Sequence, residues 1–305
     1  MNPRVFVVIL TWNYKDVTVE CLNSVLSLDY QPLDVVVVDN HSLDGTPDLI
    51  RSRFPSVKLL VCEKNHGFAG GMNKGIACAL DHGAGQVLIL NNDTVLPPDL
   101  LVHLVKASQE SQNRDVGVFV PKICYFEDKK RIWAAGARWR KFPPIVTMIG
   151  FKSADGPHYN EPREIEFATG CALLVRRQVF EHVGLFDPAY FMYYEDYDFC
   201  QRVRIKYRIL YVPTACLWHK VSISAGEGSP QKWYYWAQSA VLFYHRYFKH
   251  PRRTLALVSA WIFFRELING QIAFAPHYYR GLRSGFERKR AVLKEKNTPV
   301  SMDKI

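Results

Sequence analysis

Short apolar runs alternate with helix-like segments over the first 120 residues. Each run has the length of a buried strand. The runs cover 5–10, 35–38, 57–61, 87–90 and 116–120. Between them, apolar residues recur at helical spacing over 17–28, 45–54, 69–80 and 97–108. Thr46 is the expected cap of the second helix, and Pro47 suits its first turn. This alternation predicts an α/β fold with a mostly parallel central sheet flanked by helices.

The pattern becomes irregular between residues 125 and 164, where prolines and glycines favour loops and short strands. This region is either a cover over a site or an insertion that binds a second substrate. A strand is expected over 166–175, and a helix from Asp196 onward, with Asp198 four residues before Arg202. A further strand over 209–212 is expected to end at Pro213.

Polar clusters follow three of the expected strands. They are Thr11-Trp12-Asn13, Asp39-Asn40 and Asn91-Asn92-Asp93. In parallel sheets, ligands bind beyond the carboxyl ends of the strands. Taken alone, the third cluster is either a polar turn or a set of oxygen ligands for a hard divalent cation that holds a phosphate. Asp39 is either a turn residue or a hydrogen-bond acceptor for a base or ribose.

The last third of the chain has a different composition. Residues 232–248 are helical in pattern and rich in aromatic side chains, and 254–264 is an apolar run too short to cross a bilayer. Eleven Lys and Arg lie between Arg246 and Lys294 against Glu266 and Glu287, so this segment carries most of the net charge of +10. The segment is either a helical pair with a solvated basic end or an interfacial element on an anionic membrane.

These features predict two domains. Residues 1–228 form the α/β domain, and 229–305 form a basic helical extension. Within the α/β domain, 1–120 are expected to bind a nucleotide, and 121–228 are expected to bind the second substrate, the acceptor, and to contain the catalytic residues. The rest of the chain is nearly neutral, which argues against a nucleic-acid-binding surface. Seven cysteines without a C-x-x-C pattern indicate reduced packing residues, and the six apolar residues at 5–10 are too few for a signal peptide. A cytoplasmic protein is therefore expected.

Three further segments carry candidate chemistry. Residues 65–75 are a glycine-rich helix entry that either approaches a diphosphate or packs tightly on a strand. Neither G-x-G-x-x-G nor G-x-x-x-x-G-K-[ST] occurs, which disfavours a nicotinamide-dependent oxidoreductase. Glu195 and Asp196 are adjacent acids among aromatic residues and suit general-base chemistry. His219 is a metal ligand only if the fold brings it beside Asp93.

Together these segments resemble family 2 inverting glycosyltransferases with a GT-A fold, most closely the rhamnosyltransferase-like branch. The resemblance runs from about Val5 to Ser224 and depends on the order of its motifs. These are Thr11-Trp12-Asn13, Val38-Asp39-Asn40-x-Ser42-x-Asp44-Gly45, Asn65-x-Gly67-x-Ala69-x-Gly71-x-Asn73-x-Gly75, Leu90-Asn91-Asn92-Asp93-Thr94, Gly170-Cys171-Ala172-Leu173-Leu174-Val175-Arg176-Arg177, Gly184-Leu185-Phe186-Asp187, Phe191-Met192-Tyr193-Tyr194-Glu195-Asp196-Tyr197-Asp198 with Arg202, and His219 with Ser222 and Ser224.

The resemblance implies transfer of a sugar from a nucleotide diphosphate sugar. It implies Asp196 as the base that deprotonates the acceptor hydroxyl, supported by Glu195, and Asp93 with His219 as ligands of Mg²⁺ or Mn²⁺. The implied nucleotide-sugar contacts are Thr11, Asn13, Asp39, Asn65, Gly71, Asn73, Lys74, Asn91 and Asn92. Asn91 replaces the first carboxylate of the family's D-x-D motif, which weakens metal binding.

The branch further implies dTDP-rhamnose as the donor, with a UDP-hexose as the alternative. It implies a lipid-linked or polysaccharide acceptor in bacterial cell-surface glycan synthesis, and peripheral contact with the inner face of an anionic cell membrane. A competing hypothesis is a non-catalytic nucleotide- or glycan-binding subunit that kept the fold; the intact Glu195-Asp196 pair argues against it.

Overall fold

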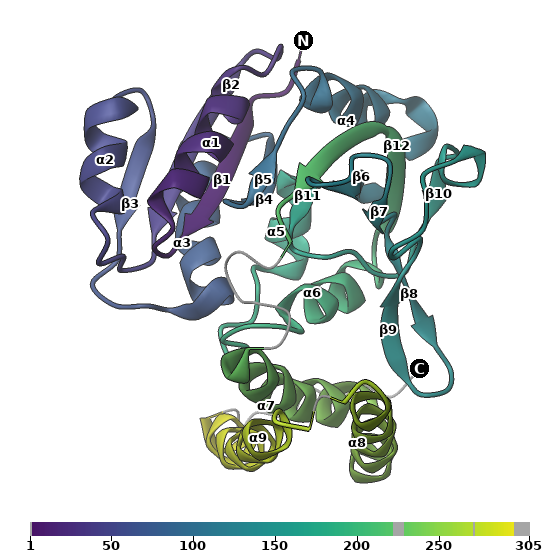
Figure 1. The fold of residues 1–305 in the computed structure, drawn as a ribbon. Coiled ribbons are helices and arrows are strands. Elements are labelled where there is room, and N and C mark those ends of the chain that lie inside the picture. The colour runs from purple at the N-terminus through teal and green to yellow at the C-terminus, as the bar shows by residue number, and fades with distance from the viewer. Residues whose placement is uncertain (1, 222–228, 271, 296–305) are drawn as a thin grey trace. The chain divides into compact units, whose positions relative to one another are not determined.

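The computed structural model describes residues 2–221, 229–270 and 272–295, with side chains as far as residue 289. Ser222 and Ser224 of the motif set, and the expected domain boundary at 228, lie outside these residues. The chain divides into two compact units (Figure 1). The first comprises Met1–Pro188 and Glu195–Ser224, and the second comprises Ala189–Tyr194 and Ala225–Ile305. The short excursion at 189–194 has no signal in the sequence pattern.

A mixed sheet forms the centre of the first unit. Its ten strands in the described residues follow the order β10-β12-β6-β11-β4-β1-β2-β3, with β5 paired to β12 and β7 to β6. The neighbours β4, β1, β2 and β3 are parallel, whereas β11 is antiparallel to both β4 and β6. The strands are β1 (Val5–Thr11), β2 (Leu33–Asp39), β3 (Lys58–Val61), β4 (Gln86–Asn91), β5 (Thr94–Val95), β6 (Val116–Tyr125), β7 (Ile132–Ala134), β10 (Arg163–Glu164), β11 (Ala172–Arg176) and β12 (Arg208–His219).

Helices cover both faces of this sheet (Figure 1). They are α1 (Lys15–Leu26), α2 (Thr46–Arg53), α3 (Gly67–Asp81), α4 (Leu100–Gln109), α5 (Arg177–Val183) and α6 (Glu195–Val203). Successive side chains of a strand point to opposite faces. Val5, Val7 and Ile9 accordingly share a core with α1, α2 and α4, while Phe6 and Val8 share another with α3, α5 and α6. The predicted α/β fold with a mostly parallel sheet is confirmed.

Two glycines bring α3 close to the sheet. A Cβ on Gly71 would lie 2.5 Å from Leu10 Cδ1, and one on Gly75 would overlap Val8 and lie 2.8 Å from Val38 Cγ2. Real Cβ atoms do not approach that closely, so only glycine permits this spacing. The glycine-rich entry therefore serves close helix-to-sheet packing at these two positions.

Three local expectations were wrong. The cap of α2 is Gly45, with φ 82°. Thr46 is the first helical residue, and its N–H donates a hydrogen bond to Asp44 Oδ1. The strand expected over 166–175 begins only at Ala172. The strand expected to end at Pro213 continues to His219 as β12, because a break in register between Val212 and Cys216 accommodates the proline.

The irregular region contains a separate hairpin of β8 (Ala137–Arg140) and β9 (Ile145–Met148). Two short 3₁₀ turns, η1 (Ser111–Asn113) and η2 (Pro157–Tyr159), lie in the connections. The expectation of short, irregular strands here is confirmed.

The second unit is helical and rich in aromatic contacts. It contains α7 (Pro230–Tyr247), α8 (Pro251–Ile268) and α9 (Ala275–Glu295). Tyr194 packs against Trp236 and Phe243 with ring centroids 5.2 and 5.1 Å apart. Trp233 and Phe274 form a second ring contact at 4.7 Å. Over the described residues, every helix is too short or too polar to cross a membrane.

Candidate active site

The three polar strand ends lie side by side at one edge of the sheet. β1 and β2 are parallel with Thr11 opposite Asp39, and β1 and β4 are parallel with Leu10 opposite Asn91. This register brings together three polar clusters that are far apart in the sequence. Any ligand held there faces the loops after β1, β2 and β4.

Asp39 is fully buried, and only one of its two carboxylate oxygens has a hydrogen-bond partner among the described residues. Its Oδ2 accepts a hydrogen bond of 2.9 Å from the Ser42 N–H, while Oδ1 is buried and has no hydrogen-bond partner among the described residues. A buried carboxylate oxygen without a partner is costly unless a ligand supplies a donor. The side chain is therefore arranged to accept a hydrogen bond from a group such as a base imide.

Asn13 ties the loop after β1 to the loop after β2. Its backbone N–H donates to Ser42 Oγ at 2.7 Å, and its Oδ1 accepts from the Leu43 N–H at 2.9 Å. It adopts a left-handed conformation, with φ 61°, which asparagine tolerates better than most residues. Asn13 thus joins the two loops that form the rim around Asp39.

Asn40 was missed in the sequence as a positioning residue. Its Nδ2 donates to Asn65 Oδ1 and to the Gly67 carbonyl, each at 3.0 Å, and its Oδ1 accepts from the His66 N–H at 2.9 Å. The Asn65 oxygen is shared with the Gly67 N–H at 2.8 Å. These bonds clamp the end of β2 to the start of α3. The sequence did offer a signal for this role, because Asn40 directly follows the aspartate at the end of a strand.

The other predicted contacts on α3 differ in their surroundings. Asn73 exchanges two hydrogen bonds with the backbone of Phe186, at 2.8 and 3.0 Å. Gly71 faces Leu10 and Asn40. Lys74 is exposed. Asn65, Gly71 and Asn73 are thus engaged in fold contacts, and Lys74 is the side chain of this group best placed to move toward an anion.

The Asn-Asn-Asp turn rests on buried hydroxyls. Asn92 Nδ2 donates to Thr18 Oγ1 at 2.9 Å and to Thr11 Oγ1 at 3.3 Å, and the two hydroxyls lie 2.8 Å apart. Thr94 Oγ1 donates to the Asn91 carbonyl at 2.8 Å. The amide nitrogen of Asn92 and the hydroxyl of Thr11 therefore form hydrogen bonds that stabilise the turn that carries Asp93.

His219 does lie beside Asp93. The short ladder between β5 and β12 pairs Thr94 with His219, and the Lys220 N–H donates to the Asp93 carbonyl at 2.8 Å. The two side chains are buried, with His219 Nε2 at 3.1 Å from Asp93 Oδ1. The Trp133 ring packs edge-on against the imidazole at 4.4 Å. The other ring nitrogen, Nδ1, is buried without a partner among the described residues.

This pair suits a divalent cation that is shared with a ligand. The described residues contain no group of three or more His, Cys, Asp or Glu side chains able to hold a metal by themselves. A carboxylate and an imidazole are nevertheless both accepted by Mn²⁺, and Mg²⁺ is bound by one or two carboxylates together with phosphate oxygens and water. Nδ1 of His219, which has no partner among the described residues, is consistent with a site that a ligand completes.

Asp196 occupies the first turn of α6 and has a raised proton affinity. Its Oδ2 accepts from the Gly170 N–H at 3.0 Å and its Oδ1 from the Tyr197 N–H at 2.8 Å. Burial raises its pKa to about 6, because desolvation outweighs these bonds to the charged form. A carboxylate with such a pKa is ionised at neutral pH and remains a competent proton acceptor.

Glu195 is buried more deeply than Asp196. Burial, and then the charge of Asp196, raise the pKa of Glu195 well above its usual value. Its Oε2 has no hydrogen-bond partner among the described residues. Asp198, by contrast, binds Arg202 at 2.9 Å, as its helical spacing predicts. Of the three acids, Asp196 is the one ready to accept a proton at neutral pH.

Two adjacent residues join Asp196 to the Asn-Asn-Asp turn. The Gly170 N–H holds Asp196, and the next residue, Cys171, accepts the Asn91 N–H at 2.9 Å through its carbonyl. A Cβ on Gly170 would lie 3.0 Å from Phe68, so a larger residue would disturb this link. Gly170 belongs to one of the motifs of the resemblance, and its role in positioning Asp196 becomes visible only in the structure.

Comparisons with known proteins show which sequences and folds this chain resembles. The family described as Glycosyl transferase family 2 matches residues 6–184. An N-acetylglucosaminyl-diphospho-decaprenol L-rhamnosyltransferase of Mycobacterium tuberculosis is 30% identical over 222 residues, or 65% of this chain and 69% of the relative. The dTDP-rhamnosyl transferase RfbF of Shigella flexneri is 25% identical over 258 residues, or 79% and 80%. The mannosyltransferase PcManGT of Pyrobaculum calidifontis, solved with GDP-Man and Mn²⁺, has a similar fold, with TM-score 0.54, 21% identity and coverage of 98% and 77%.

Proposed function

This chain belongs to glycosyl transferase family 2, in its rhamnosyltransferase branch, and from that premise we propose that it moves rhamnose from dTDP-rhamnose to an acceptor hydroxyl with inversion at the anomeric carbon. The proposed acceptor is a lipid-linked or polysaccharide glycan of a bacterial cell surface. A uridine diphosphate hexose is the alternative donor.

Asp39 is proposed to select the base. Thymine and uracil present an imide N–H, and the buried Asp39 Oδ1 supplies an acceptor without a partner among the described residues. Cytosine presents an acceptor nitrogen in place of that imide N–H, so it would set a lone pair against the Asp39 carboxylate if it bound in the same position. The surrounding loops, tied through Asn13 and Asn40, hold the carboxylate in place before the nucleotide arrives.

Asp93 and His219 are proposed to hold Mg²⁺ or Mn²⁺ against the diphosphate. A divalent cation there would offset the negative charge that develops on the leaving diphosphate. Asn91 contributes no charge, so we expect weaker metal binding than two carboxylates would give. The rigid base under the turn, from Asn92, Thr11 and Thr18, keeps Asp93 in position.

Asp196 is proposed as the general base. It accepts the proton of the acceptor hydroxyl as that oxygen forms a bond to the anomeric carbon from the face opposite the diphosphate. The bond between the anomeric carbon and the diphosphate oxygen breaks, and the nucleoside diphosphate leaves. One displacement of this kind inverts the configuration. Glu195 is proposed to orient the acceptor or support Asp196.

The observation that carries this proposal is the Gly170-Cys171 link. It supports the base on one side, through the Gly170 N–H, and the diphosphate turn on the other, through the Cys171 carbonyl. This link supports the proposal because it fixes the proposed base relative to the turn proposed to hold the diphosphate, and fixed orientation of the reacting groups favours a displacement.

A donor screen tests the proposal. Transfer to a lipid-linked acceptor should be greatest with dTDP-rhamnose, should fall in a chelator and should return with Mn²⁺ or Mg²⁺. Asp196→Asn should lower turnover roughly 10²–10⁴-fold while donor affinity stays near that of the wild type. Asp48→Asn, at an exposed carboxylate of α2 outside the proposed chemistry, is the control. Turnover of Asp196→Asn at the wild-type rate would reject Asp196 as the base.

Peripheral attachment to an anionic membrane is also proposed, at the inner face of the cell membrane. α8 exposes large apolar side chains on the described surface of the second unit, including Phe264, Leu267 and Ile268, which are 65, 59 and 68% exposed. Apolar side chains beside a basic segment are typical of helices that lie in the membrane interface.

A further inference from the structure

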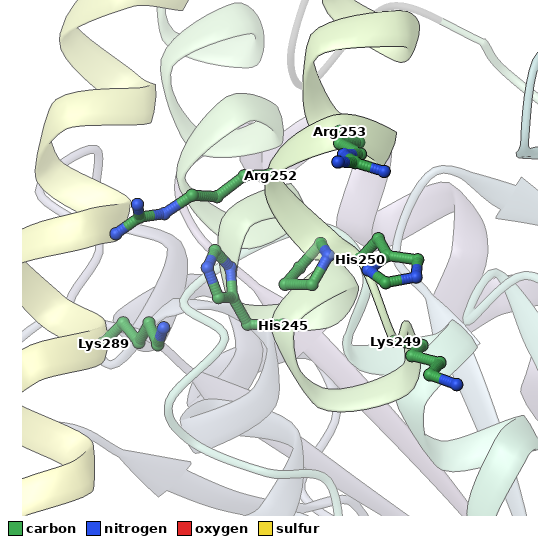
Figure 2. A pocket seen from close by; sticks show the side chains of 7 residues that line it. His245, Lys249, His250, Arg252, Arg253 and Lys289 are labelled. Carbon is green, nitrogen blue, oxygen red and sulfur yellow. The ribbon is translucent and has the colours of Figure 1, made fainter.

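A cavity of about 360 Å³ in the second unit is lined almost entirely by basic side chains. Its lining residues, all of them described, are His245, Lys249, His250, Pro251, Arg252, Arg253 and Lys289. They come from the end of α7, the connection that carries Lys249 and His250, the first turn of α8, and α9 (Figure 2). None of the residues assigned to sugar transfer lines this cavity, so its chemistry needs a separate explanation.

The close packing of α9 on α7 puts Lys289 in this position. A Cβ on Gly281 would overlap the Tyr234 carbonyl, and one on Gly285 would lie 2.6 Å from the Gln238 carbonyl. The two glycines are four residues apart, and Lys289 follows after four more, so it continues the same helical face. The corresponding step along α7 leads from Val241 to His245.

His245, Arg252 and Lys289, one from each helix, lie near one another on one side of the cavity (Figure 2). Nδ1 of His245 lies 2.8 Å from the Val241 carbonyl, to which it can donate. With Nδ1 engaged in this way, Nε2 can donate to a ligand when the ring is protonated. The Phe286 ring packs edge-on against His245 at 5.5 Å and helps fix its plane.

These cations lack a counter-charge in the described part of the second unit. Glu266 is paired with Arg265, and Glu287 with Arg283 at 3.1 Å, and neither acid lines the cavity. Burial, and then the charges of Lys289 and Arg252, lower the pKa of His245. Burial and Arg252 lower the pKa of Lys289. The positive charges of Arg252 and Lys289 therefore repel each other and disfavour protonation of His245 until an anion enters.

We propose that His245, Arg252 and Lys289 form a binding site for a phosphate group. Arginine and lysine both bind phosphate oxygens strongly, and a protonated imidazole adds a further donor. The phosphate could come from the headgroup of an anionic phospholipid or from a soluble diphosphate. This site is independent of the sugar-transfer reaction proposed above.

Arg252 and Arg253 also lie in the first turn of α8, where no acidic side chain is present. Positive charge at a helix N-terminus is unfavourable, whereas a phosphate there is favoured by the helix dipole. Without an anion these arginines lower the stability of α8, and a bound phosphate would offset that cost. The arrangement therefore supports a phosphate site.

Binding to the full-length chain tests the site. Inorganic pyrophosphate is titrated in the presence of a chelator, and co-sedimentation is measured with vesicles of phosphatidylcholine alone or with roughly one-third phosphatidylglycerol. Arg252→Gln and Lys289→Gln should each weaken binding of the preferred phosphate source about fivefold. The control Arg280→Gln removes one exposed charge from α9 outside the cavity and should change binding less than twofold.

The two arms identify the source. Loss of pyrophosphate affinity in the cavity variants assigns a soluble diphosphate, and loss confined to the anionic vesicles assigns a lipid headgroup. Equal losses in Arg280→Gln and the cavity variants would show diffuse attraction and overturn the site. So would the absence of binding in both arms.

A second measurement separates binding from folding. Without ligand, Arg252→Gln and Lys289→Gln should melt at the wild-type temperature or higher, because each relieves repulsion. The His245 imidazole signal in NMR should move to a higher pKa when phosphate binds, since an anion offsets Arg252 and Lys289. Lower melting temperatures, or a His245 pKa that phosphate leaves unchanged, would contradict the proposal.

Discussion

Burial gives the adjacent acids Glu195 and Asp196 different proton affinities. The pKa of Glu195 is raised well above its usual value, whereas that of Asp196 is raised to about 6, since Asp196 accepts two backbone N–H bonds. At neutral pH Asp196 is thus largely ionised, beside a neighbour whose pKa is raised by its deeper burial and by the charge of Asp196. Separation of two proton affinities by environment is how one pair of carboxyls takes two roles.

The raised pKa of Asp196 predicts a pH profile for sugar transfer. The base must be ionised, so kcat/KM should be level above about pH 7 and should fall as the pH drops through about 6. Protonation is favoured in the folded state, so Asp196→Asn should unfold at the same temperature as the wild type or higher at pH 8. Rates at fixed donor concentration between pH 5 and 8 check the first expectation. A transfer rate that does not fall as the pH drops through about 6 would contradict Asp196 as the base.

The unpartnered oxygen of Asp39 predicts nucleotide selectivity. Asp39→Asn should weaken binding of dTDP and UDP by roughly 10–100-fold, because a hydrogen bond to a buried charge is lost. Calorimetric titration measures the change. Asp34→Asn lies on the same strand, at its other end beside Arg4, and is a matched control that should bind normally. Equal affinities of Asp39→Asn and the control would rule out the base-reading role.

At the scale of elements, α3 shows how glycine sets the distance between a helix and a sheet. Gly75 faces Val8 and Val38 with no room for a methyl group, and Asn40 ties the helix entry to the end of β2. The position of α3 therefore depends on packing and on one asparagine, and the loops around Asp39 depend on the position of α3.

This packing predicts a large cost for a small substitution. Gly75→Ala should lower the free energy of unfolding of the first unit by about 1–3 kcal/mol, although alanine favours helices, because the new methyl group overlaps Val8. The matched control is Gly156→Ala, at an extended position with nothing within 4 Å of the added Cβ. Urea unfolding should separate the two variants. A Gly75→Ala variant as stable as the control would contradict the tight packing.

At the scale of the whole molecule, charge and exposed apolar surface are concentrated in the second unit. The proposed membrane contact predicts that Phe264→Glu lowers co-sedimentation with anionic vesicles several-fold, because an exposed apolar side chain is lost and a repelled charge is added. Ile205→Glu makes the same kind of change at a 62% exposed side chain of the first unit and serves as the control.

Transfer to a soluble acceptor should be equal in these two variants and the wild type. Vesicle binding that is unchanged by Phe264→Glu, or lowered equally by both substitutions, would reject α8 as the contacting element. This test is distinct from the phosphate site, because Phe264 does not line that cavity.

The sequence by itself determined the α/β class, the order of the first strands and helices, and the polar clusters after β1, β2 and β4. Those features depend on apolar periodicity and turn residues, which act over a few positions. It also indicated the Glu195-Asp196 pair and the basic C-terminal segment, because both are contiguous in the chain.

Only the tertiary structure decided which of these side chains meet and which remain unsatisfied. His219 reaches Asp93 across 126 positions because β12 continues past Pro213 and pairs with β5. Gly170 holds Asp196 across 26 positions, and Asn40 secures α3. Such contacts depend on register and burial between distant segments, for which neighbouring residues carry no signal. The same reason applies to Asp39 Oδ1, whose missing partner is visible only when everything around it is in place.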